Sequence, residues 1–333
     1  MTDTSGVPTR ASAKQAGFAI VKAAISFGLL YLLFQTYDIE AALRRVAGIE
    51  LSGFFIAVAL LLIAIVFAAW RWQIIVRALG ASLQFRTVFS LVWIGMFFNQ
   101  ALPSNLGGDA VRIWIFYRQD GVLKRAIGSV LLDRVAALVG LALLALLTFP
   151  LAAQFIDDTA ILAILAFLVT IIFVGLLALL WLDRFMVLFR RLLPSRLYLS
   201  ITSLAEDSRI VLAPHRFGPH VLGLSIANQI LMVLVMFALA KGLSIDVELL
   251  ALLVLIPPVI LASLLPISFA GWGIREGAMI AMLGTVSVPP ENALVLSVAF
   301  GFLTLIMSLP GACVWLLSGN RKLPKDNSEH TEG

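Results

Sequence analysis

Two short stretches of this sequence place polar and charged side chains inside an otherwise apolar chain. Residues 98–112 read FNQALPSNLGGDAVR, and residues 265–276 read LPISFAGWGIRE. Both stretches share one spacing, with a glycine five residues after a proline and an arginine nine residues after it. Inside a lipid bilayer such residues are tolerated only where they line a cavity or are covered by protein. We therefore expect these two stretches to form the functional site of the molecule.

The chemistry that the first stretch offers is the binding of an anion. Arg112 follows Asp109 by three residues, so the two side chains share one face if the segment is helical. A half-helix that begins at Gly107 and Gly108 would point its backbone N–H groups into the protein. That end of a helix attracts phosphate. The sequence therefore predicts a phosphate-binding element here.

The second stretch repeats the arrangement, with Arg275 and Glu276 after two glycines. Ionisable side chains within a membrane are functional candidates by default. The alternative is that these charges only neutralise one another and hold a helix bundle together. We expect Asp133, in a long apolar segment, to pair with Arg112 or Arg275 and not with its neighbour, because adjacent helical residues do not face each other. The residues predicted to bind substrate are Asn99, Asn105, Gly107, Gly108, Asp109, Arg112, Asp133, Arg134, Gly271, Gly273, Arg275 and Glu276.

Motifs for other kinds of catalysis are missing from the sequence. It contains no nucleophile elbow, Walker loop, HExxH motif or zinc-ligand spacing. Cys313 is the single cysteine, and the three histidines are scattered. The longest polar loop, residues 183–216, is shorter than an ordinary domain. We expect no metal and no cofactor.

Composition indicates an all-α, polytopic membrane helix bundle. Hydrophobic residues make up 61% of the 333 residues and charged residues only 13%, about half the charged share of a soluble domain. Several apolar runs reach roughly 20 residues, which is enough to span a bilayer as helices. The net charge of +5 fits basic cytoplasmic loops better than nucleic-acid binding.

The apolar runs predict about eight full spans and two partial, re-entrant helices. The full spans are expected near residues 17–36, 51–70, 85–101, 126–149, 160–182, 217–240, 247–266 and 291–317, and the partial helices near 105–118 and 270–284. We expect a single transmembrane domain at 16–318 between tails at 1–15 and 319–333. Pro257 and Pro258 should break their span, as a hinge or a kink. Asn228 and Gln229 favour either hydrogen bonding between helices or ligand binding.

Basic residues predict the topology. The N-terminal tail and residues 71–86, 119–125 and 183–216 carry excess Lys and Arg, as does the C-terminus, so we expect all of them, including both termini, in the cytoplasm. Arg71 between Trp70 and Trp72 reads as an anchor at the membrane interface. Residues 183–216 form either a helix in the headgroup layer or an ordinary basic loop.

The topology sets the direction of the two motif stretches. It requires residues 105–118 to run towards the cytoplasm and residues 270–284 to run away from it. One motif used in opposite directions predicts an inverted repeat. The alternative is chance recurrence of a short pattern.

The sequence resembles the lysylphosphatidylglycerol synthase transmembrane region family, also called flippase-like or UPF0104 proteins. The residues that carry the resemblance are Arg71-Trp72, Asn99, LPSNLGGDAVR at 102–112, Asp133-Arg134 and AGWGIREG at 270–277. The resemblance covers about residues 17–317. This family includes the membrane half of enzymes that make and flip aminoacylated phosphatidylglycerol, and stand-alone proteins, some near polyprenyl-phosphate glycosylation systems. The aminoacyl-transferase domain of the full enzymes has no counterpart in this sequence, so the resemblance implies lipid translocation.

We therefore expect a translocase of the bacterial inner membrane that moves an anionic, aminoacylated or polyprenyl-phosphate lipid between leaflets. One alternative is a membrane transferase that uses a lipid-linked donor, with Asp109 or Glu276 as its base. Another is a non-catalytic partner of a glycosyltransferase or synthase. The expected partners are membrane lipid and a second copy of the chain, and not nucleic acid.

Overall fold

The computed structural model describes residues 39–102, 107–167, 169–171, 174–175, 206–211, 217–264 and 271–318. Regular structure in this part of the chain is helical, without strands, which confirms the all-α class. The labelled helices are α2 (Ile39–Ala47), α3 (Leu51–Ala78), α4 (Phe85–Ala101), α5 (Gly107–Asp120), α6 (Leu123–Ala152), α9 (Gly218–Gly242), α10 (Leu249–Leu264), α11 (Ile274–Gly284) and α12 (Pro290–Leu317). Residues 159–167, 169–171 and 206–211 are helical as well. The expected span at 17–36, most of the 183–216 loop and both tails lie outside the described residues.

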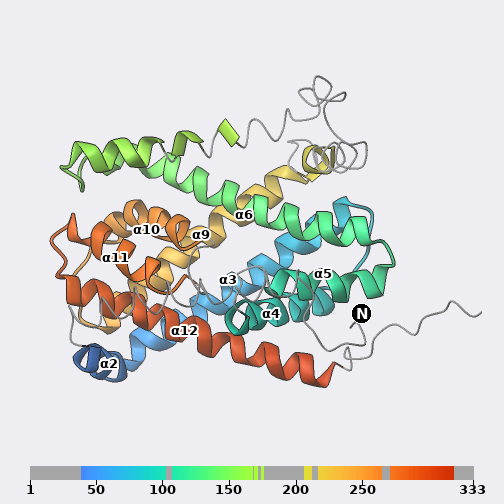
Figure 1. Cartoon of the computed structure of the whole chain (residues 1–333), viewed down its shortest axis with the longest axis horizontal. Coiled ribbons are helices and arrows are strands. Elements are labelled where there is room, and N and C mark those ends of the chain that lie inside the picture. The colour runs from blue at the N-terminus through green and yellow to red at the C-terminus, as the bar shows by residue number, and fades with distance from the viewer. Residues whose placement is uncertain are drawn as a thin grey trace, which may run out of the picture.

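Four long apolar helices form the frame of the molecule. Helices α3, α6, α9 and α12 contain 28, 30, 25 and 28 residues and are long and apolar enough to cross a membrane. At 1.5 Å per residue they are about 38 to 45 Å long, and they run along the long axis of the molecule (Figure 1). A membrane protein is thus confirmed, whereas the predicted count of eight full spans is not, because the described residues contain four such helices.

Small residues let the long helices approach closely. Helix α3 packs along α9, with Gly53 against Gly242 and the Glu50 N–H donating to the Gly242 carbonyl at 2.8 Å. Helix α6 packs along α9, with Gly140 against Ser225. Glycine and serine at helix crossings are typical of membrane bundles, because close backbone approach increases van der Waals contact where lipid gives no hydrophobic driving force.

Two helical hairpins are inserted between the long helices. Helix α4 packs against α5, and α10 packs against α11. Helices α4 and α10 have 17 and 16 residues, or roughly 25 Å at 1.5 Å per residue, so each is shorter than the four frame helices. The segments expected to span fully at 85–101 and 247–266 are thus the first arms of hairpins.

The two hairpins occupy opposite ends of the molecule (Figure 1). Helix α5 leads into the start of α6, and α11 leads into the start of α12. Those two starts lie at opposite ends of the long axis, so α5 and α11 both run outward from the middle, in opposite directions (Figure 1). A pseudo-two-fold relation between the hairpins stays a prediction.

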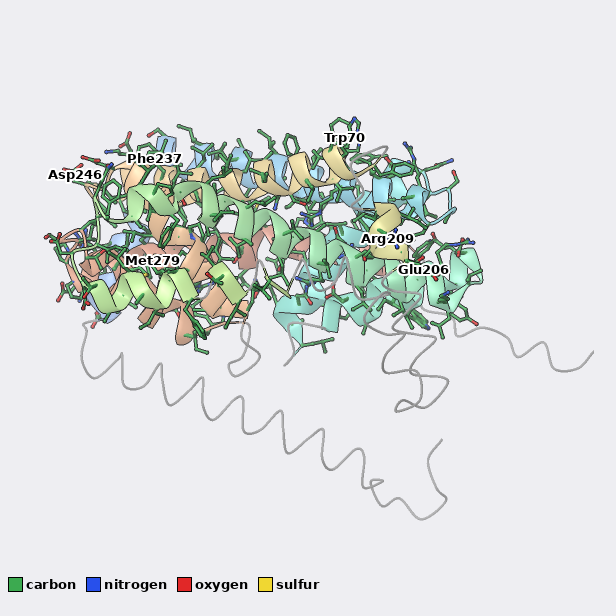
Figure 2. All side chains as sticks on the ribbon, turned by 90° about the horizontal axis from the view of Figure 1, so that it is seen from above. Trp70, Glu206, Arg209, Phe237, Asp246 and Met279 are labelled. Atoms are coloured by element: carbon green, nitrogen blue, oxygen red, sulfur yellow. The ribbon has the colours of Figure 1, made fainter. Side chains whose placement is uncertain are left out.

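Two local predictions were wrong. Helix α3 does not end at Trp70 but continues to Ala78, and Arg71 and Trp72 are 4% and 0% exposed. Only Trp70, at the outer edge of the molecule in Figure 2, is half exposed, so the three residues do not form an interfacial anchor. Helix α10 continues through Pro257 and Pro258, so the helix is not interrupted there, whereas a kink at these residues stays a prediction. Buried proline is tolerated in membrane helices where neighbouring helices cover the freed backbone.

The two ends of the molecule differ in charge. Asp246 lies at one end, and Glu206 and Arg209 lie towards the other (Figure 2). Described side chains at the end where α6 begins are mainly basic: Arg77, Arg86, Arg118, Lys124, Arg125 and Arg209 stand against Asp120, Glu206 and Asp207. Those at the end where α12 begins are mainly acidic: Glu40, Glu50, Asp157, Asp158, Asp246, Glu248 and Glu291 stand against Arg44, Arg45 and Lys241.

Candidate functional site

A cavity of about 380 Å³, with charged side chains in a largely apolar wall, lies near the middle of the helix bundle. Its walls come from near the midpoints of all four frame helices, for example Ala68 on α3, Ala137 on α6, Met232 on α9 and Thr304 on α12. The hairpin helices α4, α5 and α11 complete the wall. The charged and amide side chains in it are Arg71, Asn99, Gln100, Arg112, Asp133, Arg134, Asn228 and Arg275.

Asp133 lies between two arginines from different helices. Arg71 Nε on α3 donates to Asp133 Oδ1 at 2.9 Å, and Arg112 Nη2 on α5 donates to Oδ2 at 3.1 Å. All three side chains are more than nine-tenths buried. The predicted pairing of Asp133 with Arg112 is confirmed, whereas Arg275 is not its partner. Arg71 is a partner that the sequence interpretation missed.

Arg134 pairs with Asp109 and not with its neighbour Asp133. Its Nε and Nη2 donate to the two Asp109 carboxylate oxygens at 2.7 and 3.0 Å. Arg112 Nη1 lies 3.6 Å from Asp109 Oδ1 and joins this pair to the first one. We call Arg71, Asp109, Arg112, Asp133 and Arg134 the charge network. Three arginines and two aspartates give it a formal charge of +1.

The network leaves hydrogen-bonding atoms unused. Among the described residues, Arg71 Nη1, Arg112 Nε and Asn228 Oδ1 are buried without a hydrogen-bond partner, and all three residues line the cavity. The Arg112 guanidinium lies over the Trp72 ring, 4.1 Å from its centroid, which stabilises a cation shielded from water. A buried polar atom without a hydrogen-bond partner costs free energy.

Close contact between α4 and α5 positions Arg112. Gly95 and Gly108 touch backbone to backbone, and the Arg112 side chain crosses over Gly95. The Gly108 N–H donates to Asn99 Oδ1 at 2.9 Å. Asn99 thus satisfies an N–H group at the start of α5 that we expected to be free for phosphate, and that expectation was wrong for this group. Gly107 packs on Leu102, and Asn105 lies outside the described residues.

A second cluster holds Arg275. Arg275 donates to Glu276 Oε1 from Nη2 at 2.8 Å and to the Ser297 hydroxyl from Nε at 3.1 Å. The Gly273 N–H donates to Glu276 Oε2 at 2.6 Å. Glu276 is fully buried, so it caps its own helix and neutralises Arg275. Of this ion pair only Arg275 reaches the cavity wall.

Glycine gives the turn before α11 its backbone conformation. Gly271 and Gly273 have φ angles of +81° and +88°, in the left-handed region that favours glycine. These two glycines form the turn from which the helix that carries Arg275 starts, and their predicted role in substrate binding stays a prediction. The Gly273 N–H, like that of Gly108, is already bonded within the protein.

The cavity wall thus contains both motif arginines, Arg112 and Arg275, together with Asn99, Asp133 and Arg134, whereas Glu276 does not line it. Gln229 donates to the Ala137 carbonyl at 3.2 Å, which confirms its interhelical role, while Asn228 faces the cavity. Arg71 was missed because the helix was expected to end at Trp70, whereas it continues to Ala78. No three His, Cys, Asp or Glu side chains come together as metal ligands in the described part of the chain.

Comparison with known proteins identifies relatives of this sequence. A family model described as the lysylphosphatidylglycerol synthase TM region matches residues 19–311. A UPF0104 membrane protein of Pyrococcus horikoshii is 24% identical over 199 residues, which are 55% of this chain and 58% of that protein. Another UPF0104 membrane protein, from Methanocaldococcus jannaschii, is 34% identical over 77 residues, which are 22% and 23% of the two chains. This chain therefore matches less than two thirds of the length of either relative. No solved structure matches significantly.

Proposed function

Because the chain belongs to the lysylphosphatidylglycerol synthase transmembrane region family, we propose that it moves an anionic, aminoacylated or polyprenyl-phosphate lipid between the two leaflets of its membrane. The observation that carries this proposal is the arginine-lined cavity near the midpoints of the four frame helices. A charged headgroup cannot cross the apolar core without polar partners, because desolvating a charge is costly. The arginine and amide side chains in the cavity wall supply such partners, while the lipid tails remain among the outer helices.

The two hairpins supply a route for alternating access. Helices α5 and α11 bring Arg112 and Arg275 to the same cavity from opposite ends of the molecule. Transporters built from inverted repeats place their substrate site between discontinuous helices at the membrane midplane. We propose that the hairpins are related in this way and that rocking of one against the other exposes the cavity to each leaflet in turn.

The charge difference between the ends sets the orientation that we propose. Cytoplasmic loops of membrane proteins carry an excess of Lys and Arg. The end where α6 begins, with Lys124 and Arg125, would then face the cytoplasm, and the acidic end with Asp157 and Asp158 would face outward. This places α5 as the cytoplasmic hairpin helix and α11 as the outer one.

Translocation can be measured with the purified full-length protein in sealed vesicles. Fluorescent phosphatidylglycerol, lysyl-phosphatidylglycerol, a polyprenyl phosphate and phosphatidylcholine are incorporated separately, and an impermeant quencher reports the fraction in the outer leaflet. We expect faster exchange of at least one phosphate-bearing lipid than in protein-free vesicles, and loss of this exchange in Arg112→Gln. The matched control is Arg77→Gln, an exposed arginine that should leave exchange unchanged.

Two results would oppose the proposal. If the folded protein moves none of these lipids in sealed vesicles, the proposed translocase function is wrong. A covalently altered lipid recovered after incubation would support the transferase alternative instead, and chromatography of the extracted lipid detects it.

A further inference from the structure

The two hairpins are held against the frame helices in different ways. Helix α5 forms ion pairs with another helix, because Arg112 binds Asp133 of α6 and Asp109 binds Arg134 of α6. Asp133 also accepts a hydrogen bond from Arg71 of α3. One network of ion pairs therefore joins α3, α5 and α6.

Helix α4 of the same hairpin is also bonded to a frame helix. Trp93 Nε1 donates to the Met307 carbonyl of α12 at 2.7 Å, and the α4 backbone at Trp93 lies directly against Gly311 of α12. Leaving an indole N–H unpaired inside the bundle costs free energy, so this bond opposes separation of α4 from α12. The α4–α5 hairpin is thus bonded to α6 and α12, and through Asp133 to α3.

The charges of the α10–α11 hairpin are instead paired within the hairpin. Arg275 and Glu276 are neighbours on α11 and bind each other at 2.8 Å, and α10 contains no charged residue. Among the described residues, Ser297 of α12 is the one side chain outside this hairpin that hydrogen-bonds it. Its hydroxyl accepts from Arg275 Nε at 3.1 Å and donates to Glu276 Oε1 at 3.0 Å.

This difference decides which hairpin can move at the lower cost. Movement of α5 away from α6 would leave Asp133 and Arg134 without their partners on α5, and uncompensated charge in a bundle is strongly destabilising. Movement of α11 keeps the Arg275–Glu276 pair intact, because both partners travel together, and breaks only the bonds to one neutral hydroxyl.

The backbone of α10 differs from that of α4 in the same sense. Pro257 and Pro258 lie inside α10, and proline has no N–H to donate to the preceding turn. Fewer backbone hydrogen bonds therefore oppose bending of α10 at these residues. Helix α4 contains no proline.

We propose that the α10–α11 hairpin is the part that moves, while α3, α4, α5 and α6 stay together, and that Ser297 is the positioning residue that holds and releases it. This inference rests on the proposed lipid-translocating function and assigns the rocking motion to one hairpin. Arg275 is then the cavity arginine that changes position, and Arg112 is the one that remains in place.

Gly301 provides a second way to test the contact between α11 and α12. A Cβ at Gly301 would overlap the Arg275 guanidinium and would lie 2.6 Å from Trp272 Cη2. The guanidinium is held by Glu276 and lies over the Trp272 ring, 4.6 Å from its centroid, so it cannot easily give way. Gly301→Ala should therefore act as a wedge that disfavours the observed position of the hairpin.

The experiment measures distances between spin labels by double electron–electron resonance. The purified full-length protein is placed in nanodiscs of phosphatidylethanolamine and phosphatidylglycerol, in a Cys313→Ser background. One pair of labels joins Ile63→Cys on α3 to Ala281→Cys on α11, and the other joins Ile63→Cys to Gln119→Cys on α5. All three positions are exposed.

We expect the α3–α11 pair to show a second distance whose population depends on Ser297. Ser297→Ala should raise the ratio of this population to the first by about fivefold, which corresponds to the loss of one net hydrogen bond. Gly301→Ala should shift the ratio in the same direction. Ser308→Ala is the matched control, because this buried hydroxyl on the same helix bonds only within α12, and it should leave the ratio unchanged.

The α3–α5 pair should keep one distance in every variant. A second distance for this pair in Ser297→Ala or Gly301→Ala would overturn the assignment of the moving hairpin. A single α3–α11 distance that neither variant changes, in protein that still elutes as a monodisperse peak, would overturn it as well.

Exchange of fluorescent phosphatidylglycerol in sealed vesicles, measured on the same variants, separates this inference from the proposed function. Two α3–α11 distances without exchange of any lipid tested would keep the moving hairpin and count against the translocase. Lipid exchange by a protein with one fixed α3–α11 distance would keep the translocase and show that the α10–α11 hairpin does not move.

Discussion

Arg71 donates from Nε to Oδ1 of Asp133 at 2.9 Å, although 62 residues separate them in the chain. This contact joins α3 to α6 near the middle of the bundle, where both residues line the cavity. Because Arg112 binds the other oxygen of the same carboxylate, one aspartate aligns two arginines from different helices.

Asp133 should couple energetically to Arg71 and to Arg112. We expect Asp133→Ala to lower the free energy of unfolding by about 3 to 5 kcal/mol, because it leaves two buried arginines short of a partner. Double-mutant cycles by thermal or denaturant unfolding in detergent should give non-additive effects with Arg71→Gln and Arg112→Gln. The control is Arg275→Gln. Arg275 forms no hydrogen bond or ion pair with Asp133, so the change in the free energy of unfolding that this variant causes should add to that of Asp133→Ala. Additivity with all three arginines would disprove the pairing.

Glu276 should matter more for stability than Ser297. Ser297→Ala removes a neutral hydroxyl that hydrogen-bonds Glu276 and Arg275, at a cost of about 1 kcal/mol. Glu276→Ala removes the cap of α11 and the partner of Arg275, and we expect a loss of about 3 to 5 kcal/mol. Unfolding curves measure both, and the serine effect should shrink in the glutamate variant. Equal losses in the two variants would contradict this arrangement.

Gly140 should resist substitution at the crossing of α6 and α9. An alanine Cβ there would lie 2.6 Å from Ser225 Cβ, so Gly140→Ala should cost about 1 to 3 kcal/mol by overpacking. Ser225→Gly in the same chain should recover part of the loss. Gly223→Ala is the matched control on α9, since a Cβ at that residue would meet nothing within 4 Å. A lower melting temperature in Gly223→Ala than in Gly140→Ala would show that this crossing is not close.

The basic end should face the cytoplasm. In a Cys313→Ser background, we expect Gln119→Cys, in the last turn of α5, to react with an impermeant thiol reagent only after cells are permeabilised. Ser287→Cys, in the exposed turn between α11 and α12, should react in intact cells. The opposite labelling pattern would show that the orientation is inverted. Labelling of both cysteines in intact cells would show that the two ends do not lie on opposite sides of the membrane.

The sequence by itself determined the class of the protein and the limits of several helices. Long apolar runs with few charges predict helices that span a membrane, because a helix hydrogen-bonds its own backbone N–H and C=O groups where lipid offers no partners. Helix α4 at 85–101 coincides with its prediction, and α12 begins one residue earlier than predicted. The pairing of Asp133 with Arg112 was also predictable, because a lone carboxylate inside a bundle needs a partner and its neighbour in the chain points elsewhere.

Only the tertiary structure decided which polar residues share the cavity. Arg71 is one of several arginines in the sequence, and its burial depends on α4 and α6 packing beside α3. Glu276 follows Arg275 in a motif that resembles a ligand site, yet its carboxylate turns back to the N-terminus of its own helix. Pro257 and Pro258 predicted an interruption of their helix, yet the helix continues through both residues. Side-chain direction, burial and helix continuity are properties of the assembled bundle, because contacts between segments far apart in the chain set them.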